Sequence, residues 1–170
     1  MSRKGSGLLG LVKEDLDAVR ERDSSRPRLG EAVLHAPWHG LVLYRLSHVL
    51  YRKGHRIGPG VLSWIGRIVS GVEIHPGARL GRRVFIDHGF GVVIGQTCVI
   101  GDDVTLYHQV TLGSRGWWQD GGPGAQRHPK VGNQVTIGVG ASVLGPVTIG
   151  DGVRIRAHSL VLGDVLGDAL

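Results

Sequence analysis

Asp87 and His88 stand together in the segment FIDHGFGVV (residues 85–93), where a carboxylate beside an imidazole has the residue types for acid–base chemistry. An aliphatic residue recurs every six positions on either side of this segment, but eight positions separate Ile86 from Ile94. Two extra residues in a repeating structure predict a bulge, and bulges re-aim side chains near active sites. A lone histidine in such a turn is more often an ordinary surface residue, so other residues must decide between the two interpretations.

Glu73, Arg127 and His128 favour the catalytic interpretation of His88. Glu73 lies one turn of the repeat earlier and, by register, at the same corner as His88. A carboxylate there would fix the tautomer of the imidazole and stabilise the imidazolium. Arg127 and His128 end a long segment without the repeat, residues 113–130, and loops on a rigid scaffold often carry function. The pattern predicts a general base at His88, an orienting acid at Glu73 and a basic pair on the loop.

The elements that position these side chains follow from the six-residue period. Its aliphatic positions are Ile74, Leu80, Ile86, Ile94, Ile100, Leu106, Leu112, Val131, Ile137, Val143, Ile149, Ile155 and Val161. Hexapeptide periodicity is typical of a parallel β-helix, in which each aliphatic side chain points into a triangular prism. Repeats of the type [LIV]-G-x-x-[STAV]-x belong to the left-handed form, an exception to the right-handed crossover rule. We therefore expect an all-β left-handed parallel β-helix over residues 71–170.

Residues 1–70 have a helical period instead and are expected to form a small α-helical region before the β-helix. Apolar residues at helical spacing predict a helix from residue 8 and a second helix over residues 31–54, which Pro37 starts or kinks. A third helix is expected to open at Pro59 and to cover residues 60–71. The histidines of this region are expected to be solvated or capping residues: His35, His39, His48 and His55.

Composition and charge restrict the class of protein. Residues 1–70 hold 12 Lys/Arg against 6 Asp/Glu, but these charges are scattered along amphipathic segments without interleaved aromatics, so no nucleic-acid partner is expected. No apolar run approaches the roughly 20 residues of a membrane helix, and the chain starts without a secretory signal. The single cysteine, Cys98, fits a reducing compartment and is expected to be a small packed residue. A cytoplasmic protein is expected.

Three longer segments give the chain a family resemblance. GVEIHPGARLGRRVFIDHGFGVVIGQT, GDDVTLYHQVTLG and RHPKVGNQVTIGVGASVLGPVTIGD resemble the catalytic core of serine O-acetyltransferase, which makes O-acetyl-L-serine for cysteine biosynthesis. EDLDAVRERD and HGLVLYRLSHVLYRKG resemble its helical domain, so the likeness covers roughly residues 8–165. The resemblance implies acetyl transfer from acetyl-CoA to the hydroxyl of L-serine, with His88 as the base and Glu73 as its orienting acid. It implies acetyl-CoA as a co-substrate, with no tightly bound cofactor and no metal.

The resemblance also implies the binding residues. Asp23 and Asp87 would hold serine through its amino and hydroxyl groups, and Arg127 and His128 would bind its carboxylate. Acetyl-CoA would lie in a groove between neighbouring prisms of a homotrimer, which the helical region could pair into a hexamer. The residues implied in CoA binding are Gly113, Ser114, Val139 and Arg154.

The chain departs from the family at several places, and Asp23 is followed by Ser24 where the family usually has proline. The usual LGGTG is LGSRG here, the loop before Arg127 is long, and the chain ends in Leu170 where the family docks cysteine synthase through a terminal isoleucine. A complex with cysteine synthase is therefore not expected.

Three alternatives remain open from the sequence. The first is a hexapeptide O-acyltransferase for another hydroxy-amino acid or a sugar, although the charges of Asp23, Asp87 and Arg127 suit an amino-acid zwitterion. The second is a zinc enzyme of the γ-carbonic anhydrase type, which needs three converging histidines, but His75 and His108 lie about two coils apart. The third is a non-catalytic regulatory β-helix.

Overall fold

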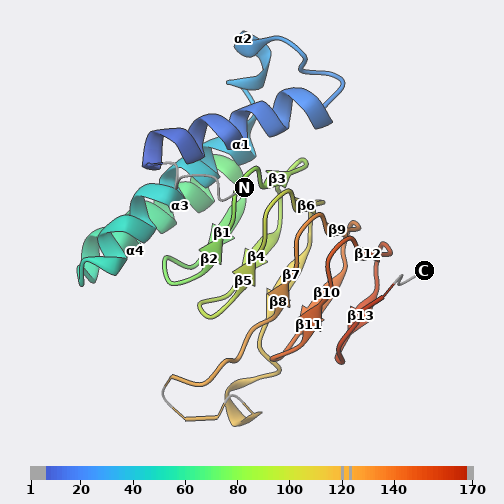
Figure 1. Cartoon of the computed structure of the whole chain (residues 1–170). Helices are drawn as coiled ribbons and strands as arrows, with labels where there is room; N and C mark the ends of the chain where they lie inside the picture. The colour runs from blue at the N-terminus through green and yellow to red at the C-terminus, as the bar shows by residue number, and fades with distance from the viewer. Residues whose placement is uncertain (1–6, 120, 123, 168–170) are drawn as a thin grey trace.

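The computed structural model describes residues 7–119, 121–122 and 124–167. Leu170 and the tail around it lie outside these residues. The chain begins with four helices, α1 (Leu8–Arg22), α2 (Leu29–Ala32), α3 (Ala36–Arg52) and α4 (Ile57–Ser70). Figure 1 shows these helices packed at the N-terminal end of a prism of short strands. No helix in the described part of the chain is long and apolar enough to cross a bilayer.

The prolines explain where two of the helices begin. Instead of one helix over residues 31–54, the structure has α2 and α3. The chain is extended between them at His35, the N-cap of α3, with φ −73° and ψ 106°, and Pro37 lies in the first turn of α3. Proline suits the first turn because its missing N–H would have no partner there. Pro59 likewise lies in the first turn of α4, which begins two residues earlier, at Ile57.

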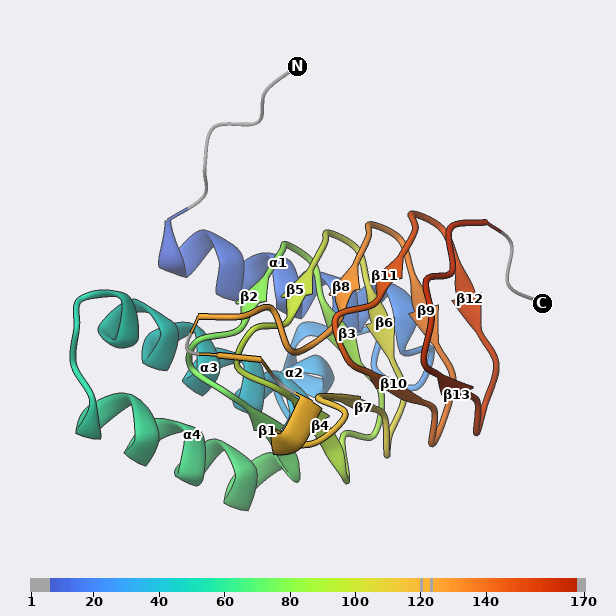
Figure 2. The ribbon, with the colours of Figure 1, turned by 90° about the horizontal axis from the view of Figure 1, so that it is seen from below.

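The rest of the chain forms a three-sided prism of parallel strands. Side A contains β1 (Val72–Ile74), β4 (Val92–Ile94), β7 (Thr111–Gly113), β10 (Ser142–Leu144) and β13 (Leu160–Val161). Side B contains β2 (Arg79–Leu80), β5 (Val99–Ile100), β8 (Lys130–Val131) and β11 (Thr148–Ile149). Side C contains β3 (Phe85–Ile86), β6 (Thr105–Leu106), β9 (Thr136–Ile137) and β12 (Arg154–Ile155). Figure 2 shows the coils succeeding one another away from the helices.

The hexapeptide register predicted from the sequence is confirmed. Each of the thirteen aliphatic positions lies in one of the thirteen strands of the described residues, and all but Leu80 and Val161 are fully buried. The partners in neighbouring coils stack in register, as Ile94 does on Ile74 and Leu112 on Ile94. The fold is the expected left-handed β-helix, whose core is one column of aliphatic side chains.

A buried ion pair holds the helices against the prism. Arg45 of α3 contacts Asp15 of α1 through Nε–Oδ2 at 3.1 Å and Nη2–Oδ1 at 3.2 Å, and both side chains are at least 95% buried. Arg45 also donates to the carbonyls of Leu80 and Gly81, while Asp15 accepts the backbone N–H of Val84. The pair therefore joins two helices to the first coil and helps to set the position of the C-terminal end of α1 relative to the prism.

The corners of the prism separate the two candidate segments. Residues 87–91, which contain the bulge, connect side C to side A, whereas the long loop between β7 and β8 connects side A to side B. In its described residues the loop has no strand and contains one 3-10 turn (Trp117–Gln119). The bulge and the loop therefore lie at opposite edges of side A, and Figure 1 shows the loop projecting on the side away from α2.

Candidate active site

The bulge at residues 87–91 sets His88 outside the stack of coils. Its backbone is left-handed at three residues, with φ of 61° at His88, 78° at Gly89 and 77° at Gly91. Glycine adopts this region readily, and His88 shares its left-handed φ with turn residues of other coils, such as Gln109 and His158. The His88 side chain is 72% exposed. The two extra residues thus form a projecting turn that presents an imidazole.

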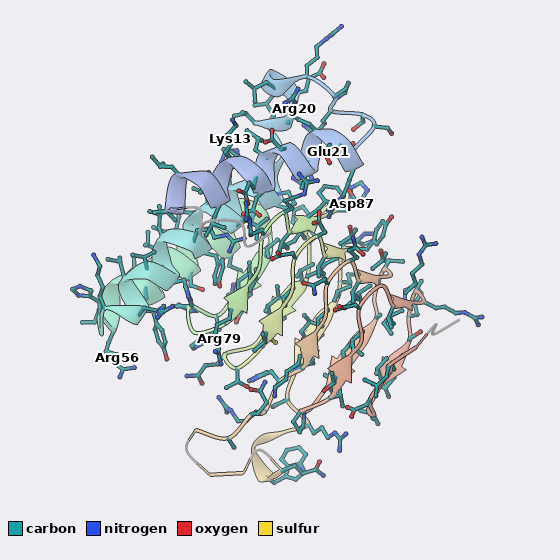
Figure 3. All side chains as sticks on the ribbon, in the orientation of Figure 1. Lys13, Arg20, Glu21, Arg56, Arg79 and Asp87 are labelled. Carbon is teal, nitrogen blue, oxygen red and sulfur yellow. The ribbon has the colours of Figure 1, made fainter. Side chains whose placement is uncertain are left out.

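His88 opens onto a pocket of about 410 Å³ that we call the bulge pocket. Three segments line it: the chain after α1, the start of α3 and the bulge. The lining residues include Asp23, Arg26, His35, Pro37, Asp87 and His88. Figure 3 shows Asp87 beside the C-terminal end of α1, where Glu21 is labelled. The structure therefore brings Asp23 together with Asp87 and His88, which follow it by more than 60 positions in the sequence.

The two carboxylates of the bulge pocket have different surroundings. Asp23 accepts hydrogen bonds from the backbone N–H and the hydroxyl of Ser25, at 3.0 and 2.6 Å, and forms an ion pair with Arg26 at 3.3 Å. Partial burial opposes ionisation of Asp23, but the Ser25 hydrogen bonds and nearby positive charge outweigh it and lower its pKa. Asp87 lies beside the candidate base, with its Oδ2 3.8 Å from Nε2 of His88. The pocket therefore presents negative charge next to an imidazole.

His108 also contacts the candidate base. Its ring lies edge-on to that of His88, with centroids 5.5 Å apart and planes at 89°. His108 belongs to the corresponding corner one coil later, which explains the stacking. The sequence did not indicate where the His108 side chain points, so no role was predicted for it.

Glu73 does not reach His88 within one chain. It lies in the middle of β1, on the flat side A rather than at the corner, in register with Val93. Its Oε2 accepts from Nη1 of Arg67 at 3.1 Å, and it lines a separate pocket beside His75. No hydrogen bond or ion pair joins Glu73 to His88, both of which are described in the structure. The orienting role of Glu73 stays a prediction.

Arg127 and His128 lie together at the other edge of side A. Nη2 of Arg127 donates to Oε1 of Gln96 at 2.6 Å, and its backbone N–H donates to the hydroxyl of Thr97 at 2.9 Å. The His128 side chain is buried, with Nδ1 2.8 Å from the same hydroxyl. The ring packs where Gly95 has no side chain, because a Cβ on Gly95 would lie 2.0 Å from it. Within one chain this pair is absent from the bulge pocket.

The residues implied in CoA binding divide in the same way. Gly113 ends β7, and Ser114 begins the long loop, on the edge that carries Arg127. The Ser114 hydroxyl accepts the backbone N–H of Gly116 at 3.4 Å. Val139 lies at the corner that carries the bulge, two coils further on, and Arg154 is an exposed residue of β12 on side C. The predicted site residues are therefore divided mainly between the two edges of side A, with Glu73 in the middle of that side and Arg154 on side C.

Sequence reasoning missed His35. It was expected to be solvated or capping, but its side chain makes no capping hydrogen bond and is 5% exposed in the bulge pocket. Its ring stacks on Phe85 at 5.6 Å. No sequence signal distinguishes it from the neighbouring His39, because its burial depends on how α3 docks on the prism. Across the described residues, no group of three His, Cys, Asp or Glu side chains is placed to hold a metal ion.

Comparisons with known proteins agree with this architecture. Residues 128–163 match the family described as "Bacterial transferase hexapeptide (six repeats)". A serine acetyltransferase of Helicobacter pylori is 46% identical over 151 residues, covering 88% of this chain and 85% of that protein. One of Mycobacterium tuberculosis is 46% identical over 159 residues, covering 93% and 67%.

Solved structures extend the likeness to three dimensions. Serine acetyltransferase isoform 3 of Entamoeba histolytica, solved with cysteine, is 36% identical with a TM-score of 0.87, over 95% of this chain and 56% of that one. The enzyme of Brucella abortus, solved with coenzyme A, is 36% identical with a TM-score of 0.86, over 92% and 61%. The chain thus spans less than two thirds of these solved proteins but most of the Helicobacter relative. On its sequence and its fold, the chain belongs to the serine acetyltransferase family of acyltransferases.

Proposed function

We propose that this protein transfers the acetyl group of acetyl-CoA to the hydroxyl of L-serine, giving O-acetyl-L-serine for cysteine biosynthesis. The observation that carries the proposal is the convergence of Asp23, Asp87 and His88 in one pocket. Two carboxylates beside a base suit an acceptor that brings both an ammonium and a hydroxyl group. The names of the relatives agree with it, and a Neisseria gonorrhoeae serine acetyltransferase 37% identical to this chain was solved with serine.

His88 acts as the general base. Its imidazole takes the proton from the serine hydroxyl as the oxygen attacks the thioester carbonyl of acetyl-CoA. The tetrahedral oxyanion that forms is stabilised by hydrogen-bond donors. When it collapses, the C–S bond breaks and the imidazolium returns the proton to the leaving thiolate. Asp23 and Asp87 bind the acceptor's amino and hydroxyl groups and hold it against the base.

A homotrimer completes the site. His88 and Arg127 lie at opposite edges of side A, so one chain cannot present both to a single serine molecule. When prisms pack side by side around a threefold axis, the bulge edge of one faces the loop edge of the next. Arg127 and His128 of the neighbouring subunit then bind the serine carboxylate, for which the guanidinium fork is suited.

Acetyl-CoA occupies the same groove. Gly113 and Ser114 of the loop edge and Val139 of the bulge edge line it along the prism, and the exposed Arg154 meets a phosphate of CoA. Glu73 is the acid that orients His88 in the assembled enzyme. For this role Glu73 must leave its ion pair with Arg67 and contact His88 instead. The ion pair is weak because both side chains are exposed to solvent.

The test is release of the CoA thiol from acetyl-CoA, with and without L-serine. We expect serine-dependent release by the protein and a loss of about 10²–10⁴-fold in kcat for His88→Ala, because one acid–base group contributes that much. His55→Ala, an exposed histidine beyond the end of α3, is the matched control and should keep full activity. Binding of CoA without serine-dependent release would contradict the serine acceptor and favour another acceptor or a regulatory role.

A further inference from the structure

His35 lies in the bulge pocket without a hydrogen-bond partner. The residue is 5% exposed, its ring stacks on Phe85 with planes at 29°, and it lines the pocket together with Asp23, Asp87 and His88. Neither ring nitrogen makes a hydrogen bond to any described residue, and Nδ1 is closed off from solvent. A buried polar side chain without a partner is rare in folded proteins and calls for an explanation.

The surroundings of His35 keep its ring neutral. Burial lowers its pKa, as do the positive charges of Arg26 and His88, and the carboxylates of Asp23 and Asp87 only partly oppose this. A neutral imidazole carries one N–H and one lone pair. A buried N–H without an acceptor is less tolerable than a lone pair without a donor, so the proton belongs on Nε2 and the lone pair on the enclosed Nδ1. Nε2–H is then a donor available to a molecule in the pocket.

We propose that His35 is an acceptor-binding residue, whose Nε2–H donates a hydrogen bond to an oxygen of the acceptor in the bulge pocket. The inference rests on the proposed function and deepens it. Asp23 and Asp87 attract the positive end of the acceptor, and they repel its carboxylate. A neutral donor beside them allows one oxygen of the acceptor to lie in the same pocket without adding a second positive charge.

The experiment compares three variants. His35→Phe keeps the ring stacked on Phe85 and removes the donor, whereas His35→Gln supplies an amide N–H with similar reach. His55→Phe makes the same change at an exposed histidine outside the pocket. For His35→Phe we expect KM for L-serine to rise about tenfold, since one hydrogen bond to the acceptor is lost. KM for acetyl-CoA should stay within about twofold, and His35→Gln should recover most of the serine affinity.

Two further measurements distinguish a failure of the His35 inference from a failure of the proposed function. Serine binding is also measured directly by titration calorimetry, and folding by far-ultraviolet circular dichroism. If the unaltered protein turns over serine and His35→Phe leaves both KM and serine affinity unchanged, only the role of His35 is overturned. If His35→Phe weakens acetyl-CoA and serine alike and His35→Gln restores neither, His35 is structural and the inference is also wrong. If the unaltered protein neither binds nor acetylates serine, the proposed function falls, and the inference with it.

Discussion

Cys98 illustrates how a residue's surroundings decide its chemistry. It is 1% exposed at the corner between sides A and B, and its Sγ donates to the carbonyl of Leu112 at 3.4 Å. Burial raises the pKa of this thiol to about 12, because the thiolate would lose its hydration inside the prism. Only the thiolate is nucleophilic, so the folded protein holds Cys98 in its unreactive form. The expectation of a small packed residue is confirmed.

Thiol labelling tests this protection. At pH 8 to 9.5 we expect no reaction of the folded protein with 5,5′-dithiobis(2-nitrobenzoate) over hours. In urea one thiol per chain should react rapidly, and faster as the pH rises, because an exposed cysteine ionises near its usual pKa of about 8.5. Absorbance at 412 nm measures both. Rapid labelling of the folded protein at pH 8 would contradict the buried position of Cys98.

At the scale of the elements, the attachment of α1 and α3 to the first coil depends on Arg45 and Asp15. Burial raises the pKa of Asp15, and the charge and hydrogen bonds of Arg45 and the Val84 N–H oppose that rise. Burying two charges costs solvation free energy, so the pair contributes specificity more than stability. Its value lies in orienting α1, whose C-terminal end carries Asp23 into the bulge pocket.

Breaking this pair should be costly in a pH-dependent way. For Arg45→Met we expect the free energy of unfolding at pH 7.5 to fall by about 3–5 kcal/mol, because a buried carboxylate is left uncompensated. Without Arg45 the pKa of Asp15 rises further above its unfolded value, so the folded variant binds more protons than the unfolded one. Its deficit relative to the unaltered protein should therefore shrink as the pH falls to 5.

Urea unfolding followed by circular dichroism measures both effects of Arg45→Met. Arg67→Met, which removes the exposed partner of Glu73, is the control and should cost no more than about 1 kcal/mol. Asp15→Asn combined with Arg45→Met should recover part of the loss at pH 7.5. Equal losses for Arg45→Met and Arg67→Met would contradict the role of the buried pair.

At the scale of the whole molecule, Asp87 and His88 lie at one edge of side A, whereas Arg127 and His128 lie at the other. Such a distribution is expected when an active site forms between identical subunits, because each chain then contributes a different half. Two variants that are each inactive because of a substitution at a different edge can therefore complement one another in a mixed trimer. The bulge edge of one variant and the loop edge of the other can rebuild an intact groove.

Mixed trimers test this arrangement. His88→Ala and Arg127→Ala are each expected to be strongly impaired, yet co-expression in equal amounts should restore about a quarter of the sites, since each site needs one chain of each kind in one order. Thiol release per trimer measures the recovery. Mixing the two purified trimers without subunit exchange is the control and should restore nothing. Absence of recovery in verified mixed trimers would place His88 and Arg127 in the same subunit's site.

The sequence by itself determined the prism and the place of the candidate base. The six-residue period is a local pattern, because each coil packs only on its neighbours, so the register could be predicted at every strand from Ile74 to Val161. The two extra residues after Ile86 likewise marked His88 for projection, since an insertion in a stacked coil has nowhere to go but outward.

Only the tertiary structure decided what surrounds that base. Asp23 and His35 enter the bulge pocket because α1 and α3 dock on the first coil through contacts between residues far apart in sequence, which no local period encodes. Glu73 turns toward Arg67 because α4 packs against β1. Arg127 lies at the far edge because the loop leaves side A at the other corner. The repeat determines which side chains enter the core of the prism. The partners of the side chains on its surface depend on how the helices and the loop pack on it.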